Sequence, residues 1–303
     1  MTLHIQTPLI ECRAMAGADG QRVWLKMEAL QPPGSFKLRG VGHACETYVR
    51  RGATRFISSS GGNAGIAAAY AGRQLGVPVL VVVPETTTER ARELIAREQA
   101  EIIVHGASFQ EANALAHSLV GPSDAFIHPF DDPLLWEGHA TMIDEVARAG
   151  LAPDMVVLSV GGGGLLCGVV EGLRRNALGH VPVIAVETVG ADSLAQSMAA
   201  HARVELPRIA SIATSLGARQ VSQQAFAYAS EHPVVSVVVS DQDAVGACLR
   251  FMDDQRVVVE PACGASLAVA YARAAALAGY KNVLMIVCGG ATATVAQLEK
   301  WSV

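Results

Sequence analysis

A lysine, two glycine-containing loops and a cysteine give this sequence its candidate chemistry. Lys37 follows the turn Q-P-P-G-S-F (31–36), from which its amine could enter a cleft as a nucleophile or base. A single lysine near a helix start can equally be an ordinary surface residue, and the neighbouring Phe36 changes that little. Cys288, in V-C-G-G-A (287–291), can equally be a buried core thiol. The loops that accompany these residues decide between the alternatives.

The loop S-S-S-G-G-N-A-G (58–65) lies between a predicted strand and a predicted helix. Small residues at a helix start leave backbone N–H groups free, and the helix dipole favours a negative charge there. We expect this loop to bind a carboxylate. A helix cap with glycines for a tight turn would have the same sequence, so that alternative stays open.

The loop S-V-G-G-G-G-L-L (159–166) carries four consecutive glycines between a strand and a helix. Such a run lets backbone amides cradle a phosphate, and it costs conformational entropy that we expect no packing to return. A dinucleotide loop needs G-x-G-x-x-G, whose last glycine would fall on Leu166 or Cys167. Glu187 ends a later strand, where a ribose-binding acid would be expected, but the glycine spacing fails. A P-loop fails too, because no G-K-[ST] follows.

The elements around these loops alternate between apolar runs and amphipathic stretches, which predicts an α/β fold. The run 79–83 has no polar alternation, which indicates burial on both faces of a parallel sheet. The predicted strands are 22–26, 55–58, 78–83, 101–105, 125–128, 155–160, 181–187, 234–239 and 283–288. The predicted helices include 63–75, 88–97, 109–120, 138–149, 165–176, 241–254 and 265–278.

Composition excludes several classes of function. The 303 residues carry a net charge of −5 and no basic run, so the sequence offers nucleic acid no electrostatic footprint. No apolar run reaches the roughly 20 residues of a membrane span, and no secretory signal is visible, so we expect a cytoplasmic protein. The six cysteines form no C-x-x-C pair, so disulfides and a zinc site are not expected.

Taken together, the motifs resemble the fold-type-II pyridoxal-phosphate (PLP) enzymes, which include the tryptophan synthase β-subunit and the cysteine synthases. Within that group they are most similar to the short serine dehydratases. The resemblance spans nearly the whole chain, through G-S-F-K-L-R-G-V-G-H, S-S-G-G-N-A-G, P-F-D-D-P-L-L-W-E-G-H, L-S-V-G-G-G-G-L-L-C-G-V-V, E-P-A-C-G-A and I-V-C-G-G.

The resemblance implies two open, twisted, mostly parallel sheets flanked by helices. A small domain of residues 43–131 would be inserted in a large domain of residues 1–42 and 132–303, with F-D-D-P (130–133) at the crossing. No regulatory domain is expected after the last strand, and a homodimer is expected.

The resemblance also implies a role for each candidate residue. Lys37 would form a Schiff base with PLP, Phe36 would pack against its ring, and Cys288 would face the pyridine nitrogen. The substrate carboxylate would be held by Ser60, Gly61, Gly62 and Asn63, with Asn63 also reaching the 3′ oxygen of the cofactor. The phosphate would be held by Gly161, Gly162, Gly163, Gly164 and Leu165. A monovalent cation, expected to be K⁺, would be held by Glu187, Ala191, Ser193 and Leu216.

The implied reaction removes water from L-serine, and from L-threonine, to give ammonia and a 2-oxo acid. Lys37, displaced by the substrate amine, would remove the α-proton, and the cofactor phosphate is our candidate acid for the departing hydroxyl. A thiol is a weaker partner for the ring nitrogen than a carboxylate, which favours elimination over transamination.

Other functions stay open at this point. Serine racemases and biosynthetic threonine dehydratases have His after the loop asparagine, where this chain has Ala64, and the position of the racemase serine is Gly61. We expect alanine at position 61 to tighten substrate binding, provided that its φ allows alanine. A β-replacement synthase and a non-catalytic PLP-binding or cofactor-free scaffold protein are further alternatives, although Lys37 and the complete phosphate loop argue against the scaffold.

Overall fold

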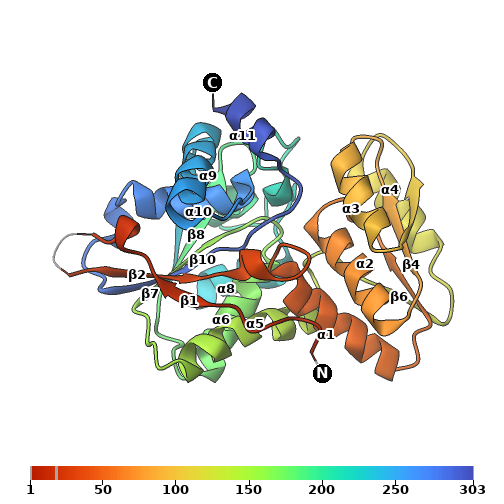
Figure 1. Ribbon diagram of the computed structural model, residues 1–303, viewed down its shortest axis with the longest axis horizontal. Helices are drawn as coiled ribbons and strands as arrows, with labels where there is room; N and C mark the ends of the chain where they lie inside the picture. The colour runs from red at the N-terminus through yellow and green to blue at the C-terminus, as the bar shows by residue number, and fades with distance from the viewer. Residues whose placement is uncertain (1, 18–19, 303) are drawn as a thin grey trace.

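Two β-sheets, each covered by helices, divide the computed structural model into two units that lie side by side (Figure 1). The structure describes residues 2–17 and 20–302. Its strands are β1 (Leu9–Glu11), β2 (Arg22–Lys26), β3 (Arg55–Ser58), β4 (Val79–Val83), β5 (Glu101–Val104), β6 (Asp124–Phe126), β7 (Met155–Ser159), β8 (Val183–Thr188), β9 (Val234–Val239) and β10 (Asn282–Ile286). Its α-helices are α1 (Lys37–Arg50), α2 (Asn63–Leu75), α3 (Glu89–Arg97), α4 (Phe109–Ser118), α5 (Pro133–Arg148), α6 (Gly164–Arg175), α7 (Ser193–Ala200), α8 (Gln223–Glu231), α9 (Asp241–Gln255), α10 (Pro261–Tyr271) and α11 (Val295–Trp301).

The larger sheet has six strands in the order β1-β2-β10-β7-β8-β9, and we call it, with its helices, the large-sheet unit. Only β1 runs antiparallel to its neighbour, and the other pairs are parallel. Every residue of β7 and β8 is buried, because helices cover both faces of the sheet. The α/β fold with mostly parallel sheets is therefore confirmed.

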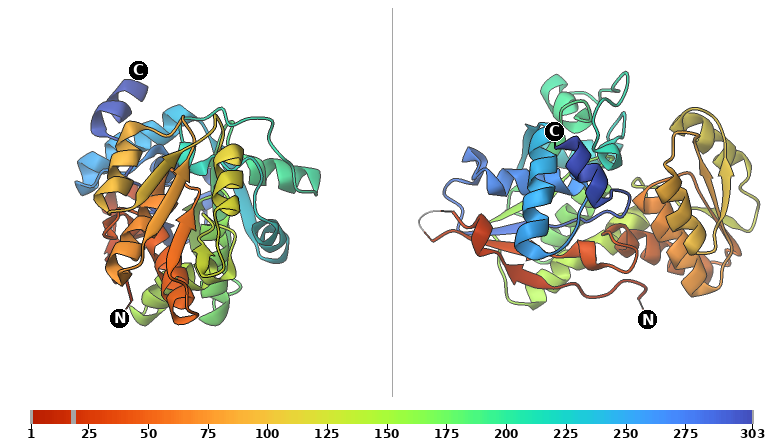
Figure 2. Two further views of the ribbon diagram at one scale, coloured as in Figure 1. Left: turned by 90° about the vertical axis from the view of Figure 1, so that its right-hand side faces the viewer. Right: turned by 45° about the horizontal axis from the view of Figure 1, so that its top comes forward.

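The smaller sheet has four parallel strands in the order β5-β4-β3-β6, and with α2, α3 and α4 it forms the small-sheet unit. All residues of Val79–Val83 are buried, as their apolar run predicts. Helices α2 and α3 lie on the side of this sheet that faces the large-sheet unit (Figures 1 and 2).

Helix α1 connects the units and packs against α5 on one side and α2 on the other. The chain returns to the large-sheet unit at residues 130–133, the crossing that the sequence suggests. There Asp132 caps α5 by accepting a hydrogen bond from the Leu134 N–H at 2.8 Å, and Pro133 occupies the first turn of the helix.

The boundaries of several elements differ from the prediction for physical reasons. The helix expected at 265–278 runs over Pro261–Tyr271, because nearly all of α10 is buried and it has no amphipathic stripe to mark its ends. The helix expected at 138–149 begins already at Pro133. Strand β1 was not predicted because it has only three residues, two of them exposed, and so carries little pattern. Within the described residues, no helix is long and apolar enough to cross a membrane.

Candidate active site

Lys37 and Cys288 come together because the loops that carry them are paired. The Phe36 N–H donates to the Cys288 carbonyl at 3.1 Å, and the Gly290 N–H donates to the Gly34 carbonyl at 2.8 Å. Lys37 begins α1 directly after this contact, and Cys288 follows β10 directly before it. These two residues, far apart in sequence, therefore lie close together in the fold.

The Lys37 amine is held in an environment that favours its neutral form. It donates to the Pro129 carbonyl and lies 5.2 Å from the centroid of the Phe36 ring. Burial lowers the pKa of Lys37 to about 8, since desolvation penalises the charged ammonium. Roughly a tenth of the amine is therefore unprotonated at pH 7, and a larger share at higher pH. The unprotonated form is the one that attacks a carbonyl or accepts a proton.

A buried network of charges anchors α1 two residues after Lys37. The Arg39 guanidinium donates to Glu28 at 2.7 and 2.8 Å and to Glu145 at 2.8 Å through each of two nitrogens. Lys26 contacts the same Glu145 carboxylate. Such paired, hydrogen-bonded charges can be buried at moderate cost. None of these residues was predicted as part of the site. Lys26 and Glu28 had a signal, as charged residues at the end of an apolar strand, whereas Arg39 and Glu145 lie within helices and had none.

The carboxylate loop leads from β3 into α2. Helix α2 begins at Asn63, and its N-cap Gly62 has no side chain to satisfy the first backbone N–H groups. A Cβ on Gly65 would lie 1.8 Å from the Ser60 carbonyl oxygen, so only glycine allows the helix to pass this loop. The free N–H groups make the loop suitable for an anion.

Gly61 is required by space rather than by backbone conformation. A Cβ at this position would lie 2.5 Å from Thr87 Oγ1 and 2.7 Å from Thr87 Cγ2. Thr87 therefore fills the space in which a side chain at position 61 would lie. This crowding argues against the expectation that alanine at position 61 would tighten substrate binding.

The glycine loop leads from β7 into α6, which begins at Gly164. Its N-cap Gly163 has φ +95°, a left-handed conformation that favours glycine. A Cβ on Gly163 would lie 2.2 Å from the Ala225 Cβ, and one on Gly162 would lie 2.3 Å from the Phe130 ring. The expectation that packing does not require these glycines is therefore wrong, because neighbouring side chains occupy the space that a Cβ would need. The first N–H groups of α6 remain suited to a phosphate.

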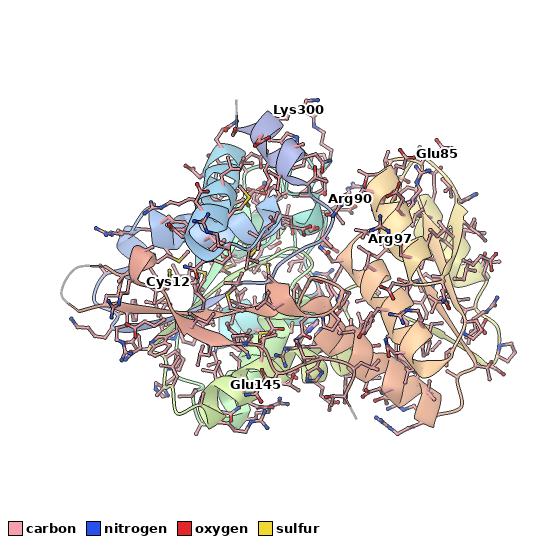
Figure 3. All side chains as sticks on the ribbon, in the orientation of Figure 1. Cys12, Glu85, Arg90, Arg97, Glu145 and Lys300 are labelled. Atoms are coloured by element: carbon pink, nitrogen blue, oxygen red, sulfur yellow. The ribbon has the colours of Figure 1, made fainter. Side chains whose placement is uncertain are left out.

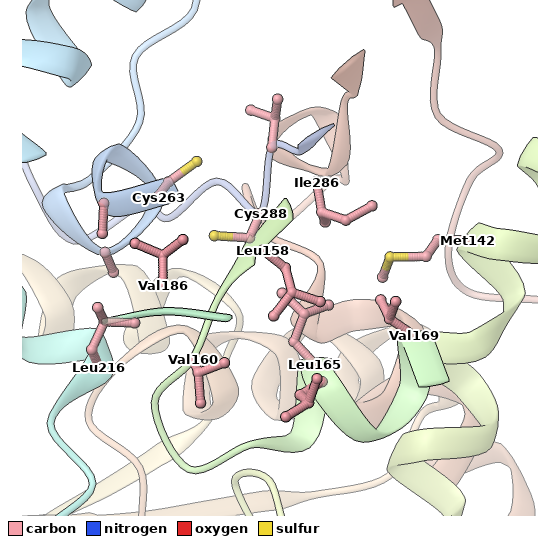
Figure 4. Packing of buried hydrophobic residues seen from close by; sticks show 14 of the residues in the cluster. Met142, Leu158, Val160, Leu165, Val169, Val186, Leu216, Cys263, Ile286 and Cys288 are labelled. Carbon is pink, nitrogen blue, oxygen red and sulfur yellow. The ribbon is translucent and has the colours of Figure 1, made fainter. Parts of the chain in front are cut away.

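Cys288 is a buried, protonated thiol. A hydrogen bond with Cys263 and burial raise the pKa of Cys288, and both side chains lie in the same buried region (Figure 4). All six cysteines are free and buried. A neutral thiol brings no charge to the ring nitrogen that it is expected to face.

The residues expected to hold a cation lie near the end of β8. Glu187 accepts hydrogen bonds from the N–H groups of Leu194 and Ala195 at 2.8 and 2.7 Å, which brings it to the start of α7 with Ser193. Burial raises the pKa of Glu187 to about 8. Ser193 Oγ is buried without a hydrogen-bond partner among the described residues. Because buried polar atoms usually have a partner, this oxygen is a candidate ligand of a bound cation.

In the described part of the chain, Ala191 and Leu216, the two other expected cation ligands, make no hydrogen bond with Glu187 itself. Ala191 pairs with Thr188, the residue after Glu187, through an N–H···O bond of 2.9 Å. Leu216 lies in a short 3₁₀ helix (Thr214–Leu216) and contacts the glycine loop, since a Cβ on Gly161 would lie 2.9 Å from its Cα.

Three polar residues around Asn63 were not predicted as site residues. The Asn63 amide contacts Glu260 and Ser215, and Thr292 contacts the same Glu260 carboxylate. Glu260 had a signal in the sequence, because an acidic residue directly before a proline is typical of a helix N-cap. Ser215 and Thr292 lie in loops and had none.

The assembled groups match the functional groups of PLP. An amine of lowered pKa can bind an aldehyde, the α6 N-terminus can bind a phosphate, and the α2 N-terminus can bind the carboxylate of an amino acid. The carboxylate loop follows the carboxyl end of β3, and the glycine loop follows that of β7. Lys37 follows a loop that is paired with the loop after β10. Ligands usually bind at the carboxyl ends of the strands in open α/β sheets.

This fold and site define a PLP-dependent enzyme of the α/β class. The sequence profile of the family described as "Pyridoxal-phosphate dependent enzyme" matches residues 1–289. The chain belongs to this family.

Similar proteins include several named dehydratases. The chain is 46% identical to L-serine dehydratase/L-threonine deaminase from Homo sapiens, over 98% of this chain and 94% of the relative. It is 41% identical to L-serine dehydratase from Dictyostelium discoideum, over 98% of this chain and 91% of the relative. The crystal structure of a fungal L-serine ammonia-lyase from Rhizomucor miehei matches with a TM-score of 0.93 and 34% identity, covering 99% of this chain and 98% of that one.

Proposed function

We propose that this protein eliminates water from L-serine, and from L-threonine, giving ammonia with pyruvate or 2-oxobutanoate. The observation that carries the proposal is the paired Lys37 and Cys288, a partly neutral amine beside a protonated thiol. The name of the relative at 46% identity supports both substrates, and the name of the relative at 41% identity supports L-serine. PLP would supply an aldehyde that binds amines and a ring that withdraws electrons from the substrate α-carbon.

Each part of the chain has a separate role in this proposal. Ser60, Gly61, Gly62 and Asn63 bind and orient the substrate carboxylate at the α2 N-terminus. Gly161, Gly162, Gly163, Gly164 and Leu165 hold the phosphate at the α6 N-terminus. Phe36 would pack against the cofactor ring, and Lys37 Nζ would accept the proton from the α-carbon.

Cys288 supports elimination over other reactions of this family. A carboxylate at the ring nitrogen would keep that nitrogen protonated and stabilise negative charge on the substrate for longer. The protonated Cys288 thiol supplies no such charge. Short-lived charge favours rapid loss of a β-substituent over transamination.

The test of this function is a measurement of both 2-oxo acids with PLP and K⁺ present. Wild-type protein should form pyruvate from L-serine, and Lys37→Ala should lose at least about 10²- to 10⁴-fold of that rate. Lys300→Ala is the control, since Lys300 is exposed on α11 (Figure 3) and should keep full activity. No 2-oxo acid from wild-type protein that has bound PLP would exclude the proposed reaction.

We also propose a monovalent-cation site, expected to prefer K⁺, at Glu187, Ala191, Ser193 and Leu216. Glu187 is the one ionisable side chain of this set, and a bound cation would favour its charged form. Ser193 Oγ, which has no hydrogen-bond partner among the described residues, supplies an oxygen beside it. Glu187→Ala should therefore blunt the activation by K⁺ that wild-type protein shows when K⁺ replaces a large organic cation. Identical activation curves for variant and wild type would remove Glu187 from the ligands.

The domain boundaries and the assembly are part of the same proposal. We place a small domain at residues 43–131 within a large domain of residues 1–42 and 132–303, in a cytoplasmic homodimer. Exposed Val235 and Val238 on the edge strand β9 are apolar surface that a second copy could cover. Sedimentation of the holoenzyme measures the assembly directly, and a monomer at micromolar concentration would contradict the dimer.

A further inference from the structure

Glu260 is a buried carboxylate to which the proposed reaction gives no role. It is 4% exposed and precedes α10 as its N-cap residue. Its Oε1 accepts a hydrogen bond from Asn63 Nδ2 at 2.7 Å, and its Oε2 accepts one from Thr292 Oγ1 at 2.7 Å. Burying a carboxylate is costly unless its oxygens are hydrogen-bonded, so these contacts are tightly constrained.

The contact with Glu260 decides which way the Asn63 amide points. Asn63 Oδ1 accepts from the Ala291 N–H at 3.0 Å, while Nδ2 donates to Glu260. A flipped amide would set its NH₂ against another N–H and its oxygen against a carboxylate. Nδ2 has a second hydrogen, whose partner here is Ser215 Oγ at the longer distance of 3.3 Å. That hydrogen is the one with which Asn63 can donate to a ligand.

The same contacts join the two units of the molecule. Asn63 begins α2 in the small-sheet unit, whereas Glu260 and Thr292 belong to the large-sheet unit. Arg90 on α3 adds a parallel contact, donating from Nε to the Ala291 carbonyl at 3.0 Å, and it lies between the units (Figure 3). The small-sheet unit therefore binds both the N–H and the carbonyl of Ala291, three residues after Cys288.

The backbone beside Glu260 is shaped to admit its carboxylate. Gly290 has φ +124°, and a Cβ on it would lie 2.0 Å from the Glu260 carboxyl carbon. Only glycine allows the chain after Cys288 to approach Glu260 this closely. The carboxylate, the glycine turn and Asn63 thus form one packed arrangement.

We propose that Glu260 is a positioning residue, which orients the Asn63 amide toward the 3′ oxygen of PLP and holds the two units together around Lys37. This inference rests on the proposed function in one respect, the contact of Asn63 with the cofactor. Glu260 itself acts through Asn63 and Thr292 and transfers no proton to the substrate.

The test compares three substitutions of Glu260 by PLP titration of the apoprotein and by hydrogen exchange of the peptides that cover 60–66 and 289–294. Glu260→Ala should weaken PLP binding about ten- to a hundredfold and speed exchange in both peptides. Glu260→Gln retains an oxygen that accepts from Asn63, and its NH₂ can donate to Thr292 Oγ1, so it should bind PLP nearly as well as wild type. Glu260→Asp keeps the charge but is too short for both partners, so it should bind PLP more weakly than Glu260→Gln.

A double-mutant cycle with Asn63→Ala shows whether Glu260 acts through Asn63. The loss caused by Glu260→Ala, or by Glu260→Asp if the alanine variant does not fold, should largely disappear in the Asn63→Ala background. Glu299→Gln, an exposed position on α11, is the control and should match wild type in titration and exchange. Additive losses, or an aspartate variant better than the glutamine variant, would overturn the proposal.

These measurements separate this inference from the proposed function. If the variants show the predicted order of PLP affinity but wild-type protein with bound PLP forms no 2-oxo acid, the proposed reaction is wrong and the proposed role of Glu260 is supported. If wild-type protein forms 2-oxo acid but Glu260→Ala leaves PLP affinity and hydrogen exchange unchanged, the proposed reaction is supported and the proposed role of Glu260 is wrong.

Discussion

Burial shifts the pKa values of the two central side chains of this site toward their neutral forms. It lowers the pKa of Lys37 to about 8, and together with the contact to Cys263 it raises the pKa of Cys288. The directions differ because desolvation penalises the charged form, which is the acid form of lysine and the base form of cysteine. One buried setting thus provides both a nucleophilic amine and an uncharged partner for a ring nitrogen.

A prediction at the residue scale concerns Gly61 and Thr87. Gly61→Ala should raise the KM for L-serine several-fold, because the added methyl group would meet Thr87 Oγ1 at 2.5 Å and push the carboxylate loop away. The second change Thr87→Ala removes Oγ1 and Cγ2, so KM should return toward the wild-type value. Steady-state kinetics of both variants measures this. Tighter substrate binding by Gly61→Ala alone would contradict the crowding.

The same space decides whether the enzyme can make D-serine. Racemisation needs a proton donor on the face of the substrate opposite Lys37, and glycine supplies none. Wild-type protein should leave serine in the L form, whereas Gly61→Ser with Thr87→Ala should produce some D-serine. Chiral analysis of serine recovered from a partial reaction measures the outcome, and abundant D-serine from wild type would refute this reading of Gly61.

At the scale of elements, helix N-termini form the anion-binding parts of the site. Helices α2 and α6 both begin without a capping side chain, so their first N–H groups are free for a carboxylate and a phosphate. Other helices of the same chain, such as α3 and α4, are capped by Thr88 and Ser108. Helices α1, α7 and α10 also begin without a capping side chain, so what distinguishes α2 and α6 is the glycine at their N-cap positions.

A prediction at this scale concerns Gly163, the residue before α6. Gly163→Ala should both lower the melting temperature and weaken PLP binding, since φ is +95° and the new methyl group would lie 2.2 Å from the Ala225 Cβ. Gly150→Ala is the matched control, because Gly150 also has positive φ, +78°, but no neighbouring atom within 4 Å. It should lose about 1–2 kcal/mol of stability from backbone strain and keep its affinity for PLP. Equal PLP affinity in both variants would separate the glycine loop from the phosphate.

At the scale of the whole molecule, one buried network of charges ties distant segments to the active-site helix. Arg39 on α1 contacts Glu28, which follows β2, and Glu145 on α5, and Thr7 near the N-terminus donates to Glu28 at 2.6 Å. The orientation of α1, and with it of Lys37, depends on this network. We therefore expect a loss of Arg39 to affect both stability and cofactor binding.

Arg39→Ala should lower the free energy of unfolding of the apoprotein by about 3–5 kcal/mol, because it leaves two buried carboxylates with one cation between them. Urea denaturation measures the loss. Arg22→Ala removes an exposed Arg–Glu pair on β2 and should shift the midpoint little. Equal midpoints for the two variants would show that the network does not hold α1.

Features that depend on residues close together in sequence can be predicted from the sequence of this protein alone. Local patterns predict the α/β alternation and the loops before α2 and α6, because helix starts and glycine turns are made by residues a few positions apart. The candidate groups Lys37 and Cys288 are visible in the sequence in the same way, since each lies in a short motif. Tertiary structure decided the contacts between residues distant in the chain. Asn63 and Glu260 are 197 residues apart, and no local pattern could pair them. The crowding of Gly61 by Thr87 and of Gly162 by Phe130 likewise exists only once separate elements pack, because it depends on distances between them.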